Sequence, residues 1–153
     1  MEKNRLHPIP SVLVRILFAA SAALLAAVLG CAGPMALDPS SGPIDVVLRA
    51  GEQRDLASWD RLAFERVVGD SRCPIGTTCV WAGAAQARVW IRTHGGKTES
   101  AELTVGADST VSPPVELGAY RLRGVRLDPY PRAQQTIHAS DYRLTLRIEL
   151  AKH

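Results

Sequence analysis

The sequence has little of what an enzyme, a metal site or an α-helical protein requires. Among 153 residues there are three cysteines and four histidines, and the histidines are far apart. No segment after residue 43 repeats apolar residues with the i, i+3, i+4 spacing of an amphipathic helix. No Gly-x-Ser-x-Gly motif or other local pairing of a nucleophile with a base is present. We therefore expect a non-enzymatic β-protein that needs no cofactor.

A metal or redox role for the cysteines is also disfavoured. Cys73 and Cys79 are separated by five residues, and His94 and His138 lie elsewhere in the chain. Structural zinc sites use closer cysteine pairs and a second close-spaced pair of ligands. Redox-active cysteines usually form Cys-x-x-Cys at a helix N-terminus. The spacing predicts neither a metal site nor a redox centre.

An excess of positive charge is lacking once the N-terminal segment is set aside. Three of the eighteen basic residues and one of the fifteen acidic residues lie in the first thirty positions, which leaves fifteen basic and fourteen acidic residues. A nucleic-acid-binding protein is expected to have a clustered basic stripe. Because the arginines here are interspersed with acidic residues, we predict no nucleic-acid partner.

The chain also lacks an apolar run long enough to cross a membrane. Its longest such run, residues 16–30 (ILFAASAALLAAVLG), has fifteen residues, whereas a membrane-spanning helix needs about 20. Lys3, Arg5 and Arg15 precede this run. Basic residues followed by a short apolar run are typical of a signal peptide. We therefore predict that residues 1–30 are a signal peptide.

The end of this leader carries a more specific motif. Val28-Leu29-Gly30-Cys31-Ala32 resembles the lipobox of bacterial lipoproteins, in which a small residue precedes an invariant cysteine. The resemblance implies that Cys31 becomes the N-terminus and carries a diacylglyceryl group, and two or more acyl chains anchor a protein stably. Ala32 in place of aspartate favours the outer membrane, with the domain facing the periplasm. The alternatives are a secretory signal cleaved near Ala32 and an uncleaved anchor.

Residues 31–43 are predicted to be a flexible tether between this lipid and a folded domain over residues 44–153. The segment from Ala32 to Pro43 contains three prolines, two glycines and two serines and shows no periodicity. If Cys31 carries lipid, Cys73 and Cys79 are the remaining pair in an oxidising compartment. They are therefore predicted to form a disulfide that closes a short loop.

The folded part alternates apolar and polar residues with a period of two, as half-buried strands do. The alternation covers 44–48, 62–68, 79–92, 101–105, 120–127 and 142–150, which predicts an antiparallel β-sandwich or small barrel. It slips at Val67-Val68 and at Gly124, where we expect β-bulges. Trp81 lies on the apolar parity of the third segment and is expected to anchor the core.

Residues around the cysteine pair form a motif: Asp70-Ser71-Arg72-Cys73-Pro74, then Gly76, Cys79, Trp81 and Gly83. This resembles the motif DSRCP-x-G-x-x-C-x-W-A-G of a family of small, uncharacterised bacterial envelope lipoproteins. The segments 127–131 and 141–142 are similar as well. The resemblance implies a lipoprotein with a disulfide and a β-fold, and it implies no catalytic activity.

Four residues are candidates for binding. Asp70 and Arg72 either form a local ion pair that stabilises the turn or belong to a charged recognition loop. Trp90 lies between Arg88 and Arg92 on the polar parity, where it either binds a protein or glycan or is covered by the loop that contains Tyr130. We expect a non-catalytic binding or structural module with an envelope protein or glycan as partner. The alternative is an inhibitor of a lysozyme or protease that attacks the envelope.

Overall fold

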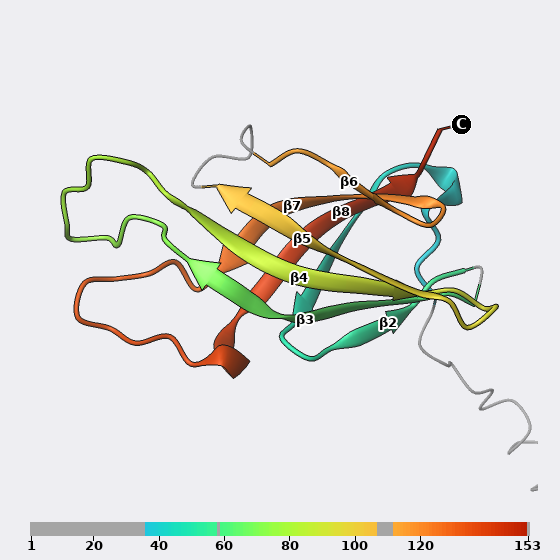
Figure 1. Ribbon diagram of the computed structural model, residues 1–153, viewed down its shortest axis with the longest axis horizontal. Helices are drawn as coiled ribbons and strands as arrows, with labels where there is room; N and C mark the ends of the chain where they lie inside the picture. The colour runs from blue at the N-terminus through green and yellow to red at the C-terminus, as the bar shows by residue number, and fades with distance from the viewer. Residues whose placement is uncertain (1–35, 58, 107–111, 153) are drawn as a thin grey trace, which may run out of the picture. The chain divides into compact units, whose positions relative to one another are not determined.

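The computed structural model describes residues 36–57, 59–106 and 112–152. The predicted signal peptide and Cys31 lie outside the described residues. Two four-stranded antiparallel sheets pack against each other as an open β-sandwich, in the orders β1-β8-β7-β6 and β2-β3-β4-β5 (Figure 1). The strands are β1 (Ile44–Arg49), β2 (Gln53–Asp55), β3 (Arg61–Asp70), β4 (Ala84–Arg92), β5 (Thr98–Gly106), β6 (Val115–Leu117), β7 (Tyr120–Asp128) and β8 (Arg143–Leu150). The predicted β-fold is confirmed as a sandwich and not a closed barrel.

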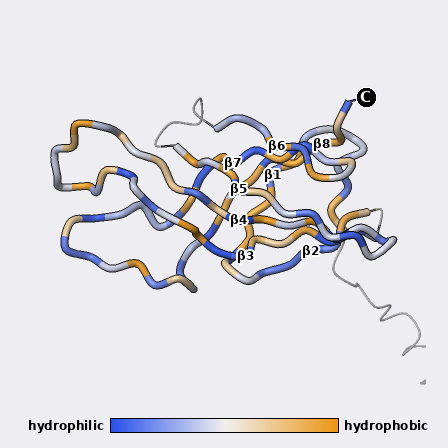
Figure 2. Tube along the Cα trace, in the orientation of Figure 1, coloured by the Kyte–Doolittle hydropathy of each residue, from blue (hydrophilic) through white to orange (hydrophobic). Residues whose placement is uncertain are grey.

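The core lies between the two sheets, and the alternation of the sequence explains it. In β4 and β8, buried residues alternate with partly or fully exposed ones. Figure 2 shows hydrophobic and hydrophilic positions along the same strands. Phe64 of β3, Val89 of β4 and Leu146 of β8 are each fully buried. Burying a side chain of this size stabilises a fold by about 1.5–3 kcal/mol.

Both predicted bulges are present. The pairing of β3 with β4 shifts between Phe64 and Arg66 and again between Val67 and Gly69. The pairing of β7 with β8 shifts after Gly124. A Cβ atom at Gly124 would lie 2.7 Å from Val105 Cγ2 on the facing sheet. The absence of a side chain at Gly124 therefore lets β7 approach β5 closely.

The described part of the segment that was predicted to be a tether packs on the domain. Leu37 pairs with Leu56: the Leu37 amide donates to Asp55 O at 2.9 Å, and its carbonyl accepts from the Ala57 amide at 2.8 Å. Pro39, in the short 3-10 helix η1 (Pro39–Ser41), is buried. Backbone hydrogen bonds of Leu37 and the burial of Pro39 hold this segment against the domain, although its composition is typical of a linker.

The expected role of Trp81 as a core anchor is also wrong. Trp81 is 81% exposed, and β4 begins only at Ala84. Gly83 turns the chain with a φ of +66°, so the residues before it leave the sheet. The apolar parity continues into the loop, but the loop extends beyond the sandwich, where no second sheet covers it (Figure 1).

Candidate binding site

Two long connections project from the same end of the sandwich. Residues 71–83 join β3 to β4, and residues 129–142 join β7 to β8, a connection that includes the short 3-10 helix η3 (Ala139–Asp141) (Figure 1). They pair with each other: the Ile75 amide donates to Pro131 O at 2.9 Å, and the Ala133 amide donates to Ile75 O at 3.0 Å. The two connections therefore form one structural unit at this end.

Arg72 links this unit to both sheets. Its side chain is buried, and its guanidinium donates to Asp70 Oδ1 at 2.8 Å and to Asp70 Oδ2 at 2.6 Å. It also donates to the carbonyls of Leu127 and Pro129, the latter at 3.0 Å. The guanidinium carbon lies 4.8 Å from the centre of the Tyr130 ring, within cation–π range. Arginine suits this position because its planar fork can serve several acceptors at once.

Asp70 is held in its ionised form by this arrangement. Burial raises the pKa of Asp70, but the hydrogen bonds and positive charge of Arg72 outweigh burial and leave the pKa below its usual value. The hydroxyl of Tyr142 also donates to Asp70 Oδ2 at 3.2 Å. Burial and the Asp70 charge both raise the pKa of Tyr142. Asp70 and Arg72 therefore form the local ion pair of the first interpretation and brace the loops, and the Arg72 side chain is buried.

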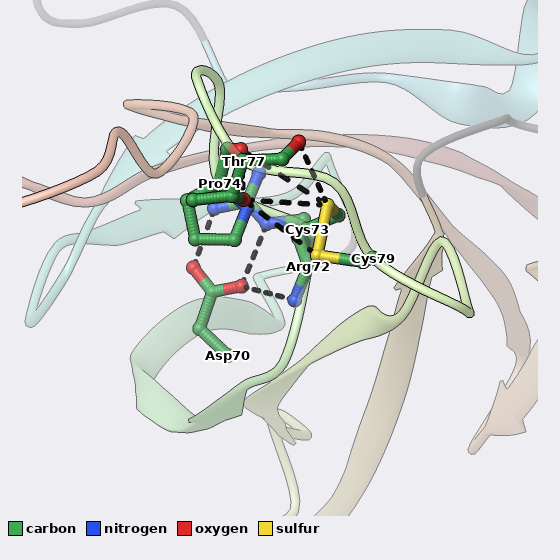
Figure 3. Close-up of a disulfide and its surroundings, with 6 residues drawn as sticks. All are labelled: Asp70, Arg72, Cys73, Pro74, Thr77 and Cys79. Atoms are coloured by element: carbon green, nitrogen blue, oxygen red, sulfur yellow. Dashed lines mark hydrogen bonds and ion pairs between the residues drawn. A yellow bond between two sulfur atoms is a disulfide. The ribbon is translucent and has the colours of Figure 1, made fainter.

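The predicted disulfide between Cys73 and Cys79 is present, with the two Cα atoms 5.9 Å apart (Figure 3). The loop that it closes is also ordered by Thr77, whose hydroxyl donates to Pro74 O at 2.7 Å. Outside the closed ring, Val80 and Trp81 are 88% and 81% exposed. The disulfide and the Arg72 contacts thus support a rigid loop with adjacent apolar residues in solvent. We call Val80 and Trp81 the apolar tip.

The structure separates Trp90 from the other three predicted binding residues. Trp90 lies on β4, where it pairs with Ala63 of β3 and Ser100 of β5. Its side chain is half-buried, and the Arg92 guanidinium lies 5.4 Å from its ring centre. Tyr130 is on the 129–142 connection, beside Arg72. The four residues therefore do not form one site.

A cleft of about 1020 Å³ lies under the 129–142 connection. Its floor is the outer face of β1, β8 and β7. The lining consists of arginines, aspartates, hydroxyl groups and a few apolar side chains: Val47, Arg49, Ile75, Arg126, Asp128, Pro129, Tyr130, Arg132, Ser140, Asp141, Arg143 and Thr145. The size of this cleft suits a small-molecule ligand.

Sequence reasoning missed this cleft, although a signal was present. The outward parity of β7 and β8 is rich in arginine, with Arg121 and Arg123 before the bulge, Arg126 after it, and Arg143 and Arg147 on β8. Acidic residues are interspersed with these arginines along the chain, so the concentration of arginine on one face of the sheet is not apparent in the linear sequence. Sorting the charges by strand parity would have placed the arginines on one sheet face.

Within residues 36–57, 59–106 and 112–152, no helix has the length and apolar character that a membrane crossing requires. No three His, Cys, Asp or Glu side chains of these residues gather as a metal site would require. Comparison of the chain with known protein families, curated proteins and solved structures finds no match.

Proposed function

We propose that this chain is a lipid-anchored bacterial envelope protein whose β-sandwich is a non-catalytic binding module. The leader motif at Cys31 supports the anchor, and so does the resemblance of the segment from Asp70 to Gly83 to small envelope lipoproteins. One observation carries the binding role. The apolar tip, Val80 and Trp81, is largely exposed to solvent on a loop that a disulfide and a buried ion pair hold rigid.

The energetics of this loop favour binding over a purely structural role. An exposed tryptophan gains no burial in the free protein, while at an interface Trp is among the residues that contribute most to affinity. A rigid loop also loses little conformational entropy when it binds. The partner that fits the apolar tip is a protein surface with a pocket for an indole ring.

The chain offers a matched control for testing the tip. Trp59 is 83% exposed, but it precedes β3, whereas Trp81 follows it, so the two lie at opposite ends of that strand. Purified wild type, Trp81→Ala and Trp59→Ala proteins would be used to capture partners from an envelope extract. Wild type and Trp59→Ala should recover the same partner and Trp81→Ala should not. Equal recovery by Trp81→Ala would overturn the proposed role of the tip.

The second candidate function is inhibition of a hydrolase that attacks the envelope. It rests on the same protruding loop, since a rigid loop with an exposed aromatic tip can enter an active-site groove. Assays with a lysozyme and with serine proteases would test it. Inhibition that disappears in Trp81→Ala but not in Trp59→Ala would favour the inhibitor over a general binding module.

The anchor is tested separately from the binding role. In a bacterial host, wild type should incorporate a labelled fatty acid and fractionate with the outer membrane. Cys31→Ala should incorporate no label. If wild type also remains unlabelled and is secreted in soluble form, the lipid anchor is wrong, whatever the result for Trp81.

A further inference from the structure

We propose that the cleft between the outer face of β1, β8 and β7 and the 129–142 connection binds a saccharide that carries a single carboxylate. The inference names a ligand class for the binding module and does not depend on the apolar tip, because neither Val80 nor Trp81 lines the cleft. Arg49 and Arg143 would hold the carboxylate, and Arg132 closes the cleft from the connection.

The strongest observation is an unneutralised pair of like charges. Arg49 of β1 lies directly opposite Arg143 of β8 in the sheet register. Residues in this relationship have Cβ atoms about 5 Å apart, and like charges there are destabilising. Neither guanidinium forms an ion pair with an acidic residue in the described part of the chain. An anion between them would remove the repulsion and would gain charge-assisted hydrogen bonds.

The acidic residue in register with Arg143 is already engaged. Asp128 of β7 is in register with Arg143, but its Oδ2 atom lies 2.6 Å from Nε of Arg126. Two residues further along β8, Thr145 pairs with Val47 of β1 on one side and with Arg126 of β7 on the other, so this position adds no carboxylate. Beyond it Arg147 is paired with Asp45 at 2.7 Å. Arg123 of β7, in register with Arg147, also has no ion pair among the described residues, but it lies outside the cleft. Within the cleft, Arg49 and Arg143 are the neighbouring arginines without a carboxylate partner.

The remaining charges of the cleft select against highly charged ligands. Its lining contains four arginines and two aspartates, a net charge of +2. A polyanion such as nucleic acid or an acidic peptide would place additional negative charges against Asp128 and Asp141, and like-charge contacts favour other partners. A ligand with one carboxylate satisfies the two arginines without this penalty.

The neutral part of the ligand is expected to be rich in hydroxyl groups. Asp141 accepts hydrogen bonds, the hydroxyls of Ser140 and Thr145 donate and accept them, and Arg132 donates them. The hydroxyl groups of a sugar can donate hydrogen bonds to the acceptors of the cleft and accept hydrogen bonds from its donors. Pro129 and Tyr130 add an apolar and aromatic wall for the C–H face of a sugar ring. Because Tyr130 is stacked on the buried Arg72, this wall is preorganised.

The test uses uronic-acid-containing di- and trisaccharides and the same sugars after reduction of the carboxyl group to an alcohol. Binding to the purified domain would be followed by NMR titration. Carboxylated sugars should bind, with shifts at Arg143 and Thr145, and the reduced sugars should not. Arg49→Gln and Arg143→Gln should each weaken binding about tenfold, the loss expected for one charge-assisted hydrogen bond.

Arg66→Gln on the opposite sheet is the matched control and should bind like wild type. Trp81→Ala should also bind the sugars normally, which separates this site from the proposed tip. Arg49→Gln should fold with unchanged or slightly higher stability, because it relieves the repulsion from Arg143. Equal binding of the carboxyl-reduced sugars would overturn the proposal. So would failure of every carboxylated sugar to bind, or preferential binding of hexaglutamate or inorganic phosphate.

Discussion

Arg72 and Asp70 form a buried ion pair, with Nη2 of Arg72 2.6 Å from Oδ2 of Asp70, although only Ser71 separates them in the chain. The same guanidinium binds the carbonyls of Leu127 and Pro129, more than fifty residues later. A local pair thus joins the end of β3 to the end of β7. That side chain therefore helps to position both long connections at this end of the sandwich, together with the backbone hydrogen bonds of Ile75.

Arg72→Ala should therefore destabilise the domain strongly. The substitution leaves the Asp70 carboxylate buried without its partner and removes the hydrogen bonds to two backbone carbonyls. Breaking a buried pair in this way costs about 3–5 kcal/mol, measurable as a lower urea midpoint. Arg88→Ala is the control, because its ion pair with Glu102 is partly exposed and such pairs contribute about 1 kcal/mol or less. Similar losses in both variants would contradict the bracing role of Arg72.

The same pair should make stability depend on pH on the acid side. Arg72 lowers the pKa of Asp70 below its unfolded value, even though burial acts in the opposite direction. The contribution is therefore fully present above the unfolded pKa of about 3.9 and is lost as pH falls through the lower folded pKa. Urea unfolding of wild type between pH 2 and 7 should show a decline beginning near pH 4.

Asp70→Asn should flatten this decline, because the group that titrates is gone. Asp45→Asn is the control. Arg147 lowers the pKa of Asp45 as well, but their ion pair is exposed. About 0.5 M salt therefore largely screens it. In high salt, Asp45→Asn should keep the acid decline of wild type. An unchanged decline in Asp70→Asn would show that other carboxyl groups are responsible.

Gly83→Ala should destabilise the domain more than Gly51→Ala. Both glycines have positive φ, +66° at Gly83 and +82° at Gly51, which costs a residue with a Cβ about 1–2 kcal/mol. A Cβ atom at Gly83 would also overlap the carbonyl oxygen of Ser71, whereas nothing lies within 4 Å at Gly51. Thermal unfolding of the two variants measures the difference. Equal losses would mean that the backbone at Ser71 moves aside freely.

Removal of the disulfide should cost about 2 kcal/mol, the value that loop entropy predicts for so short a ring. The double variant Cys73→Ser, Cys79→Ser should retain the fold, because Arg72 and the Ile75 backbone hydrogen bonds hold the same connection independently. Its reduced stability would be seen in urea unfolding, and hydrogen exchange should increase mainly in residues 71–83. Global unfolding of the double variant at room temperature would show that the disulfide, and not Arg72, holds this end together.

Local patterns in the sequence were sufficient for the six longer strands and the bulges, but not for the three-residue strands β2 and β6. The period-two alternation of β8 and the glycine at the β7 bulge each depend only on residues near them in the chain, so they can be recognised from a short stretch of sequence. The disulfide was also predictable, because assigning Cys31 to lipid leaves Cys73 and Cys79 as the remaining pair in an oxidising compartment. These features determined the fold class before any tertiary contact was known.

Only the tertiary structure decided where Trp81, Arg72 and the arginines of the cleft lie. The parity of Trp81 is that of a core residue, but burial requires an opposing sheet, and its loop extends past the end of both sheets. A charged residue such as Arg72 is expected at the surface, but its side chain is buried. Carbonyl groups of β7 and of the loop after it accept its hydrogen bonds. Arg49 and Arg143 are ninety-four positions apart in the sequence and become neighbours only when β1 pairs with β8. Contacts of this kind depend on which strands pair, and strand pairing is a property of the whole chain.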